Sequence, residues 1–93
     1  MSTTITFKKP FEFDGEEFKE ITLNLDGLKG RDITDTQRQY TAEGNFSAVP
    51  ATDPEFCKRI AALASSQTLE FFEDLPAPDF IKVTTSVQNF LLV

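Results

Sequence analysis

Two runs of alternating apolar residues, one on each side of Asp14-Gly15, constrain the start of this chain more than any other feature. The apolar residues fall on odd positions in both runs: Ile5, Phe7, Phe11 and Phe13 before the dipeptide, and Ile21, Leu23 and Leu25 after it. A period of two is typical of a strand with one buried face. Because Asp-Gly tolerates the positive φ of a tight turn, we predict an antiparallel β-hairpin over residues 3–25.

The length of the hairpin loop decides which residues face each other. A two-residue loop at Asp14-Gly15 would place Phe7 opposite Thr22 and turn the apolar residues of the second run to the wrong face. A three-residue loop over residues 14–16 instead pairs Phe7 with Leu23. We therefore expect the longer loop, unless another irregularity shifts the register by an equivalent amount.

The longer loop also pairs Ile5 with Leu25 and turns Phe18 outward. A bulge near Pro10 is the equivalent alternative, because proline has no N–H to give to a ladder and occurs at strand edges and bulges. The sequence leaves both arrangements open.

A first helix is predicted over residues 33–43. Asp32 precedes it as an N-cap, since a carboxylate there accepts hydrogen bonds from the free N–H groups of the first turn. Gly44-Asn45 ends it. Ile33 and Tyr40 are its large apolar residues, so we expect a narrow buried stripe and a largely solvated helix. Residues 46–52 are predicted to form a linker.

A second helix is predicted over residues 54–66. Asp53-Pro54 is a strong start signal, because Asp caps a helix and Pro at the first helical position lacks an N–H that has no partner there. The expected buried face consists of Phe56, Ile60, Leu63 and Ala64, at i, i+4, i+7 and i+8. Residues 68–75 either continue this helix or form a separate turn, and both remain open.

A last helix is predicted over residues 78–92, after a break at two prolines. Its apolar stripe recurs at i, i+3, i+7, i+10 and i+11 and consists of Phe80, Val83, Val87, Phe90 and Leu91. Such a stripe either closes the core or binds a partner. Both can hold at once, with Phe80 and Val83 packing inward and residues 90–93 reaching a partner.

These elements predict an α+β fold, in which an N-terminal antiparallel hairpin is followed by about three α-helices. The chain has 93 residues, and two separate cores of half that size would each be too small to be stable. Residues 1–93 are therefore expected to form one small domain.

The composition disfavours catalysis, metal binding and nucleic-acid binding. Fifteen acidic and nine basic residues give a net charge of −6, which repels a polyphosphate at long range. The chain has no histidine, the commonest general base and metal ligand, and we expect no cofactor. Cys57 is expected to pack as a small apolar residue. The acidic runs at residues 16–20 and 70–74 are expected to be solvated.

Membrane and secretory signals are missing from the sequence. No run approaches the roughly 18 apolar residues that a membrane helix needs. No apolar stretch behind a basic flank opens the chain, as a secretory signal would, and a single cysteine cannot form an internal disulfide. We therefore expect a cytoplasmic protein that does not contact membranes.

Four segments stand in a recognisable order along the chain. They are Phe11-Glu-Phe-Asp-Gly-Glu-Glu-Phe18 at the hairpin turn, Leu25-Asp-Gly-Leu-Lys-Gly-Arg-Asp32, Ala61-Ala-Leu-Ala64, and Leu75-Pro-Ala-Pro-Asp-Phe80 with the stripe that follows it. Their order and spacing resemble the phage tail assembly chaperone family. The resemblance spans nearly the whole chain and departs at residues 46–52, which are linker-like.

The resemblance implies a small protein without catalytic residues, present in the cytoplasm of a bacterial host of a long-tailed phage or prophage. Such proteins bind the long helical tape measure protein and keep it soluble. They help the tail tube protein polymerise around it and are absent from the mature virion. Many families also make a longer form by ribosomal frameshifting, through which the tail tube protein is engaged. This chain would be the short form.

The predicted partner-binding residues for this role are those of the last helix: Phe80, Val83, Val87, Phe90 and Leu91. Phenylalanine supplies a large contact area without a polar group to satisfy. Because coating a long filament takes many copies, we also expect self-association. Two other functions remain open, namely a small structural or adaptor protein retained in the phage particle and an acidic inhibitor of a host enzyme.

Overall fold

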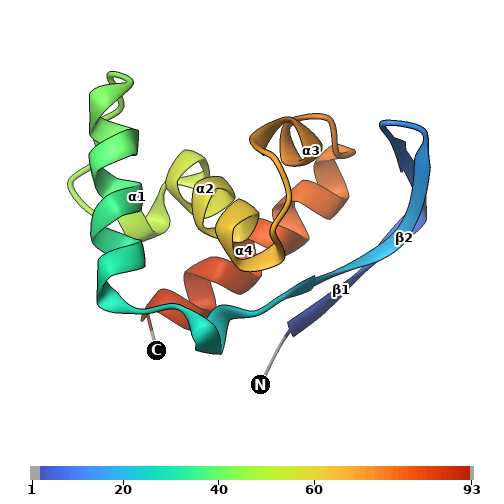
Figure 1. Cartoon of the computed structure of the whole chain (residues 1–93), viewed down its shortest axis with the longest axis horizontal. Helices are drawn as coiled ribbons and strands as arrows, with labels where there is room; N and C mark the ends of the chain where they lie inside the picture. Colours follow the sequence, from blue (N-terminus) through green and yellow to red (C-terminus); the bar gives the residue numbers. More distant parts are fainter. Residues whose placement is uncertain (1–2, 93) are drawn as a thin grey trace.

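The computed structural model describes residues 3–92, which form a two-stranded sheet followed by helices (Figure 1). The elements are, in chain order, β1 (Thr3–Phe13), β2 (Glu16–Leu23), η1 (Leu25–Gly27), α1 (Gly30–Ala42), η2 (Pro50–Thr52), α2 (Pro54–Ser65), α3 (Leu69–Glu73) and α4 (Ala77–Leu92), where η marks a short 3-10 helix. Helix α2 lies between α1 on one side and the hairpin on the other (Figure 1). The predicted α+β class is confirmed.

The hairpin turns through two residues. Asp14 and Gly15 both have positive φ, 53° and 80°, as a two-residue turn of type I′ requires. Phe13 therefore faces Glu16 directly across the turn. The predicted three-residue loop is wrong, because Asp-Gly adopts the tighter turn at little steric cost.

An irregularity near Pro10 changes the register of the hairpin. The pairing shifts between Thr6 and Phe11, and Pro10 lies in this segment, where its missing N–H cannot disturb a ladder. Past the shift, Ile5 faces Ile21 and both side chains are buried. Of the two predicted arrangements, the bulge near Pro10 is thus confirmed.

The pairs expected from the longer loop do not form. Leu23 faces Thr3 and not Phe7, and Leu25 lies in η1, outside the sheet, instead of opposite Ile5. Leu23 and Leu25 are nevertheless buried. The irregularity shifts the pairing by three residues, between Phe11↔Phe18 and Thr6↔Glu20, and it places Ile5 opposite Ile21.

Phe71 of α3 is the centre of an aromatic cluster beneath the hairpin. Its ring contacts those of Phe7 (6.5 Å between centroids), Phe11 (5.2 Å), Phe13 (5.4 Å), Phe18 (4.9 Å) and Phe72 (5.1 Å). Phe18 is thus half-buried and not turned outward as predicted, because the two-residue turn sets it opposite Phe11. Each such ring pair contributes roughly 0.5–1.5 kcal/mol to stability beyond the contribution of its buried area. The cluster fixes the hairpin on α3.

Helix α4 holds the outer edge of β1. The Lys8 amide donates to Oδ1 of Asp79 (3.1 Å), a residue that is only 1% exposed. Lys82 Nζ donates to the Thr6 carbonyl (3.1 Å). An edge strand presents unpaired backbone groups, and these two bonds satisfy such groups while joining the hairpin to α4.

Helix α1 begins at Gly30, before the predicted start at residue 33. Lys29 is its N-cap, and Asp32, predicted to be the cap, is the third residue of the helix. The Asp32 carboxylate accepts from the Lys29 amide (2.8 Å). It stabilises the helix start from inside the first turn, as the acidic residue of a capping box does.

Helix α2 begins where predicted, with Asp53 as the N-cap accepting from the Glu55 amide (2.9 Å). Packing against several elements buries a continuous run: Phe56, Cys57, Lys58, Arg59, Ile60, Ala61 and Ala62. Leu63, predicted to lie on the buried face, is 47% exposed. The single-face prediction is wrong because α2 contacts α1, α3, α4 and β2 on different sides.

Residues 68–75 hold a separate short helix. Ser66 ends α2 with a left-handed φ of 60°, and the hydroxyl of Thr68 then caps α3 by accepting from the Phe71 amide (3.3 Å). This break turns the chain so that Phe71 and Phe72 enter the core. Of the two possibilities open for this segment, the separate turn is the one that forms.

Replacing Phe71 by alanine is expected to lower the free energy of unfolding by about 3–5 kcal/mol, as truncation of a buried phenylalanine does. Urea denaturation followed by circular dichroism measures the effect. Phe46→Ala is the matched control, because Phe46 is 89% exposed and its loss should change stability by less than about 0.5 kcal/mol. Equal effects of the two substitutions would contradict the assigned role of Phe71.

Candidate binding surfaces

The structure divides the five predicted partner-binding residues of α4 into three groups. Val83 and Val87 are completely buried in the core. Phe80 and Leu91 are half-buried and pack against that core. Phe90 is 39% exposed. The inner part of the stripe therefore closes the core, and only its end is open to a partner.

The C-terminal end of α4 is an exposed apolar surface. Phe90 lies seven residues after Val83 and three after Val87, so it continues the same helical face beyond the core. Leu92 is 54% exposed. Residues 83–93 contain no ionisable side chain, and Val93, also predicted to reach a partner, lies outside the described residues. We call the exposed side chains of Phe90 and Leu92 the α4 tip.

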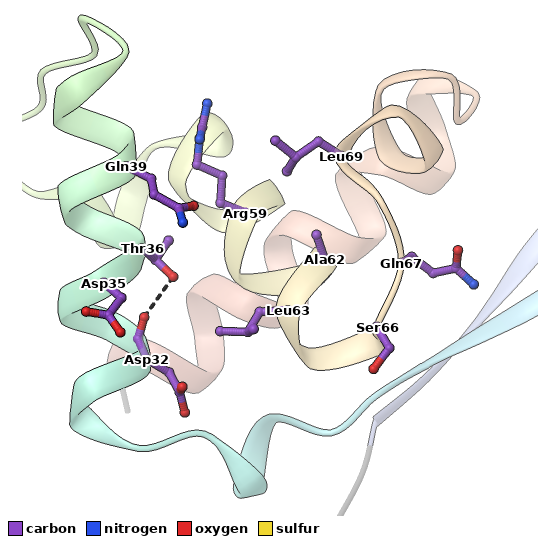
Figure 2. A pocket seen from close by; sticks show the side chains of 10 residues that line it. All are labelled: Asp32, Asp35, Thr36, Gln39, Arg59, Ala62, Leu63, Ser66, Gln67 and Leu69. Carbon is purple, nitrogen blue, oxygen red and sulfur yellow. Dashed lines mark hydrogen bonds between the residues drawn. The ribbon is translucent and has the colours of Figure 1, made fainter.

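A groove of about 530 Å³ separates α1 from α2 (Figure 2). It is lined by Asp32, Asp35, Thr36, Gln39, Arg59, Ala62, Leu63, Ser66, Gln67 and Leu69. Figure 2 shows Leu63 projecting from α2 toward α1, and Leu69 extending from the start of α3 on the same side. Leucine and alanine side chains thus form the apolar part, and polar groups of α1 form the opposite wall. We call this space the α1–α2 groove.

Phe46 is the most exposed large apolar side chain of the described residues, at 89%. Its loop follows α1 and is held by Asn45, whose amide and side-chain nitrogens both donate to the Tyr40 carbonyl (3.2 and 3.1 Å). The sequence prediction of a linker missed this residue. The available signal was an aromatic residue without a helical or strand-spaced apolar partner, in a stretch without charges.

Buried ion pairs on α2 hold the ends of α1 and α3. Arg59 donates from Nη1 and Nη2 to both carboxylate oxygens of Glu43 (2.9 and 2.8 Å) and from Nε to Glu55 (2.9 Å). Lys58 donates to Glu55 (3.0 Å) and Glu73 (2.9 Å). Both cations are less than 8% exposed, and each is fully paired, so neither is offered to a ligand.

The pKa values of these groups follow from the pairing. Hydrogen bonding and charge from Arg59 hold the pKa of the Glu43 carboxyl below its usual value. Burial alone would lower the pKa of Lys58, but its hydrogen bonds to Glu73 and Glu55 outweigh burial and raise it. Glu43, Arg59 and Lys58 are therefore all charged near neutral pH.

Cys57 and Tyr40 are likewise structural. Cys57 is buried, and burial together with the charge of Asp53 raises the pKa of its thiol to about 11. The thiol stays protonated and donates to the Ala51 carbonyl (3.3 Å). The Tyr40 hydroxyl donates to Asp53, which raises its pKa to about 12. The predicted packing role of Cys57 is confirmed.

Within residues 3–92 no group of three or more Cys, Asp and Glu side chains is placed to hold a metal ion. In the same range, every buried side-chain nitrogen or oxygen has a hydrogen-bond partner. None of the helices described has both the length and the apolar character needed to cross a bilayer.

The Arg59–Glu43 pair predicts how stability depends on pH. Because the bond to Arg59 holds the folded-state pKa of Glu43 below its ordinary value, its stabilising contribution is complete above the ordinary pKa of a glutamate and is lost as pH falls through the lower, folded-state pKa. Glu43→Gln should therefore be less stable than wild type at pH 7, and the gap should close at acidic pH. Urea midpoints between pH 3 and pH 7 test this, and a gap that is independent of pH would contradict it.

The family model described as phage tail assembly chaperone proteins, E, or 41 or 14, matches residues 4–92. No curated protein and no solved structure matches the chain. The match covers the hairpin and all four α-helices and confirms the resemblance drawn from the order of the sequence segments. The chain therefore belongs to the phage tail assembly chaperone family.

Proposed function

We propose that this chain is a non-catalytic chaperone that binds the tape measure protein during tail assembly, and that the α4 tip makes the contact. The observation that carries the proposal is the exposure of Phe90 and Leu92 at the end of α4, beyond the point where Val83 and Val87 are buried in the core. Exposed apolar area that a core does not use is typical of an association surface.

The chemistry of the tip suits a helical apolar partner. Phe90 and Leu92 carry no polar groups to desolvate, and the neutral stretch of residues 83–93 imposes no charge requirement on the partner. Contact would remove apolar surface from water at about 25 cal/mol per Å². The net charge of −6 meanwhile opposes aggregation of the complex.

The pairing of the polar groups supports a role without chemistry. The buried cations Lys58 and Arg59 are both engaged with carboxylates, and the Cys57 thiol has its pKa raised to about 11. A nucleophilic cysteine needs the opposite shift. With no histidine in the chain, the remaining groups favour binding over catalysis.

The wider assembly role follows from the same proposal. The chain acts in the cytoplasm of the bacterial host, and a longer frameshifted form that begins with the same fold engages the tail tube protein. The chaperone leaves when the tube has polymerised around the tape measure protein. A structural protein retained in the particle would instead remain bound.

Mass spectrometry of purified virions distinguishes these two fates. We expect peptides of the tail tube and tape measure proteins and no peptides of this chain, since its contacts with the tape measure protein are replaced by the tube. The infected-cell lysate, in which the chain should be detected, is the control. Stoichiometric amounts of the chain in virions would show that it is a structural component.

Replacing Phe90 and Leu92 together by serine should reduce binding of the tape measure protein more than about tenfold, because truncating an anchoring apolar residue costs about 1–2 kcal/mol. Co-expression and measurement of the soluble tape measure protein provide the readout. Leu91 is left unchanged because it packs against the core.

Ile81→Ser is the matched control. Ile81 is 56% exposed on the same helix, but it lies eleven residues before Leu92, so its loss should leave binding unchanged. Circular dichroism should show the same helix content in all variants. Wild-type amounts of soluble tape measure protein with the Phe90→Ser, Leu92→Ser variant would disprove contact through the α4 tip.

A further inference from the structure

We infer that Asn89 is a specificity-determining residue of the α4 tip, and that the segment bound there places a neutral hydrogen-bonding side chain opposite it. This role rests on the proposed function, because it concerns the segment of the tape measure protein that contacts Phe90 and Leu92. The last turn of α4 carries it, since one exposed amide lies there between two exposed apolar side chains.

Asn89 lies between the two side chains of the tip on the solvent side of α4. Successive residues of an α-helix are rotated by about 100° around its axis. Phe90 is therefore rotated about 100° from Asn89 in one direction, and Leu92 about 60° in the other. Leu91 falls on the opposite side of the helix, where it packs against the core. A partner that contacts both Phe90 and Leu92 from the solvent side has to cover Asn89.

The side-chain amide of Asn89 is free to bind a partner. The residue is exposed, and within residues 3–92 its side chain forms no hydrogen bond with the protein. Asn45, by contrast, uses its side-chain nitrogen to donate to the Tyr40 carbonyl. Covering an amide without a replacement hydrogen bond is unfavourable, because its bonds to water are lost. The bound segment therefore has to supply a hydrogen-bonding group at this point.

The group opposite Asn89 is neutral, because α4 offers no countercharge there. Residues 83–93 contain no ionisable side chain. The nearest charged residue of α4 is Lys82, about two turns before Asn89, and its ammonium already donates to the Thr6 carbonyl. A buried charge without a partner is far more costly than a buried neutral polar group. Asparagine, glutamine, serine and threonine are the side chains that meet this need.

An amide between two apolar contacts fixes where the partner binds. Apolar contact is non-directional, so Phe90 and Leu92 alone would accept many positions along an apolar stripe. A polar residue within an apolar contact between helices specifies their register, at a cost in affinity. In a wrong register the amide of Asn89 is left unpaired, which disfavours that register. Asn89 thus selects segments whose apolar stripe is interrupted by a neutral polar residue.

Replacing Asn89 by leucine and by glutamine tests this role. The two new side chains are similar in bulk and both favour a helix, but only glutamine keeps an amide. Asn89→Leu should raise the dissociation rate of the complex with the tape measure protein about tenfold or more, because it leaves the partner's polar group unpaired. Asn89→Gln should stay within about threefold of wild type. Co-expression, purification of the complex and measurement of its dissociation provide the readout.

Gln37→Leu is the matched control. It makes the same kind of change at an exposed amide of α1, away from the α4 tip, so the dissociation rate should equal that of wild type. Circular dichroism should show the same helix content in all three variants.

The direction of the change in Asn89→Leu separates this role from a purely apolar contact. Leucine enlarges the exposed apolar area of the tip, so a segment that is apolar throughout would bind the variant as tightly as wild type or more tightly. Either result would overturn the inference. Equal losses with Asn89→Leu and Asn89→Gln would overturn it as well, because they would assign the effect to bulk and not to the amide.

Photo-crosslinking reports the register directly. A benzophenone amino acid in place of Phe90 keeps an aromatic group at the tip. Its crosslinks should fall within about one helical turn of an asparagine, glutamine, serine or threonine of the tape measure protein, and they should spread along the apolar stripe when Asn89→Leu is added. Crosslinks without this preference in the chain that retains Asn89 would contradict the inference.

Failure of the proposed function is distinguishable from failure of this role. If the Phe90→Ser, Leu92→Ser variant binds like wild type, the α4 tip is not the contact, and the role of Asn89 fails with it. If that variant loses binding while Asn89→Leu keeps or gains it, the contact through the tip stands and only the role of Asn89 is disproved.

Discussion

The packing of five phenylalanine rings around Phe71 is the interaction on which the rest of the structure depends. A two-stranded hairpin is marginally stable by itself in water, and a five-residue helix such as α3 is far below the length at which isolated helices persist. Each element therefore needs the other. Edge-to-face contacts at 4.9–5.4 Å between Phe71 and three hairpin rings join them, while bonds from α4 to the Lys8 amide and Thr6 carbonyl align the strand edge.

With the hairpin fixed on one side, α2 becomes the central helix and has to satisfy neighbours on several sides. Its two cations do so by pairing with carboxylates from α1 and α3, Arg59 with Glu43 and Lys58 with Glu73. Removing one partner from a buried pair is costly because it leaves a charge without compensation. These pairs hold the chain segments that flank α2 while leaving Leu63 at the surface. The Arg59–Glu43 pair joins the end of α1 to the middle of α2, and Arg59 also lines the α1–α2 groove.

Local signals predicted most of the fold from the sequence. Asp53-Pro54 located the start of α2, and the alternation of apolar residues located both strands, because capping and strand periodicity depend on near neighbours. The hairpin loop could not be settled in this way, since a tight turn plus a bulge and a longer loop both bury Leu23. The exposure of Leu63 also depends on which helices surround α2, and helical spacing carries no information about neighbours that are distant in sequence. The stripe of α4 was visible, but the division between buried Val87 and exposed Phe90 depends on where the core ends.

The exposed apolar residues lie in separate parts of the chain. Phe46 follows the end of α1, whereas Phe90 and Leu92 end α4, and neither set lines the α1–α2 groove. Surfaces that share no residue can be occupied at the same time, and their binding energies then add without direct competition.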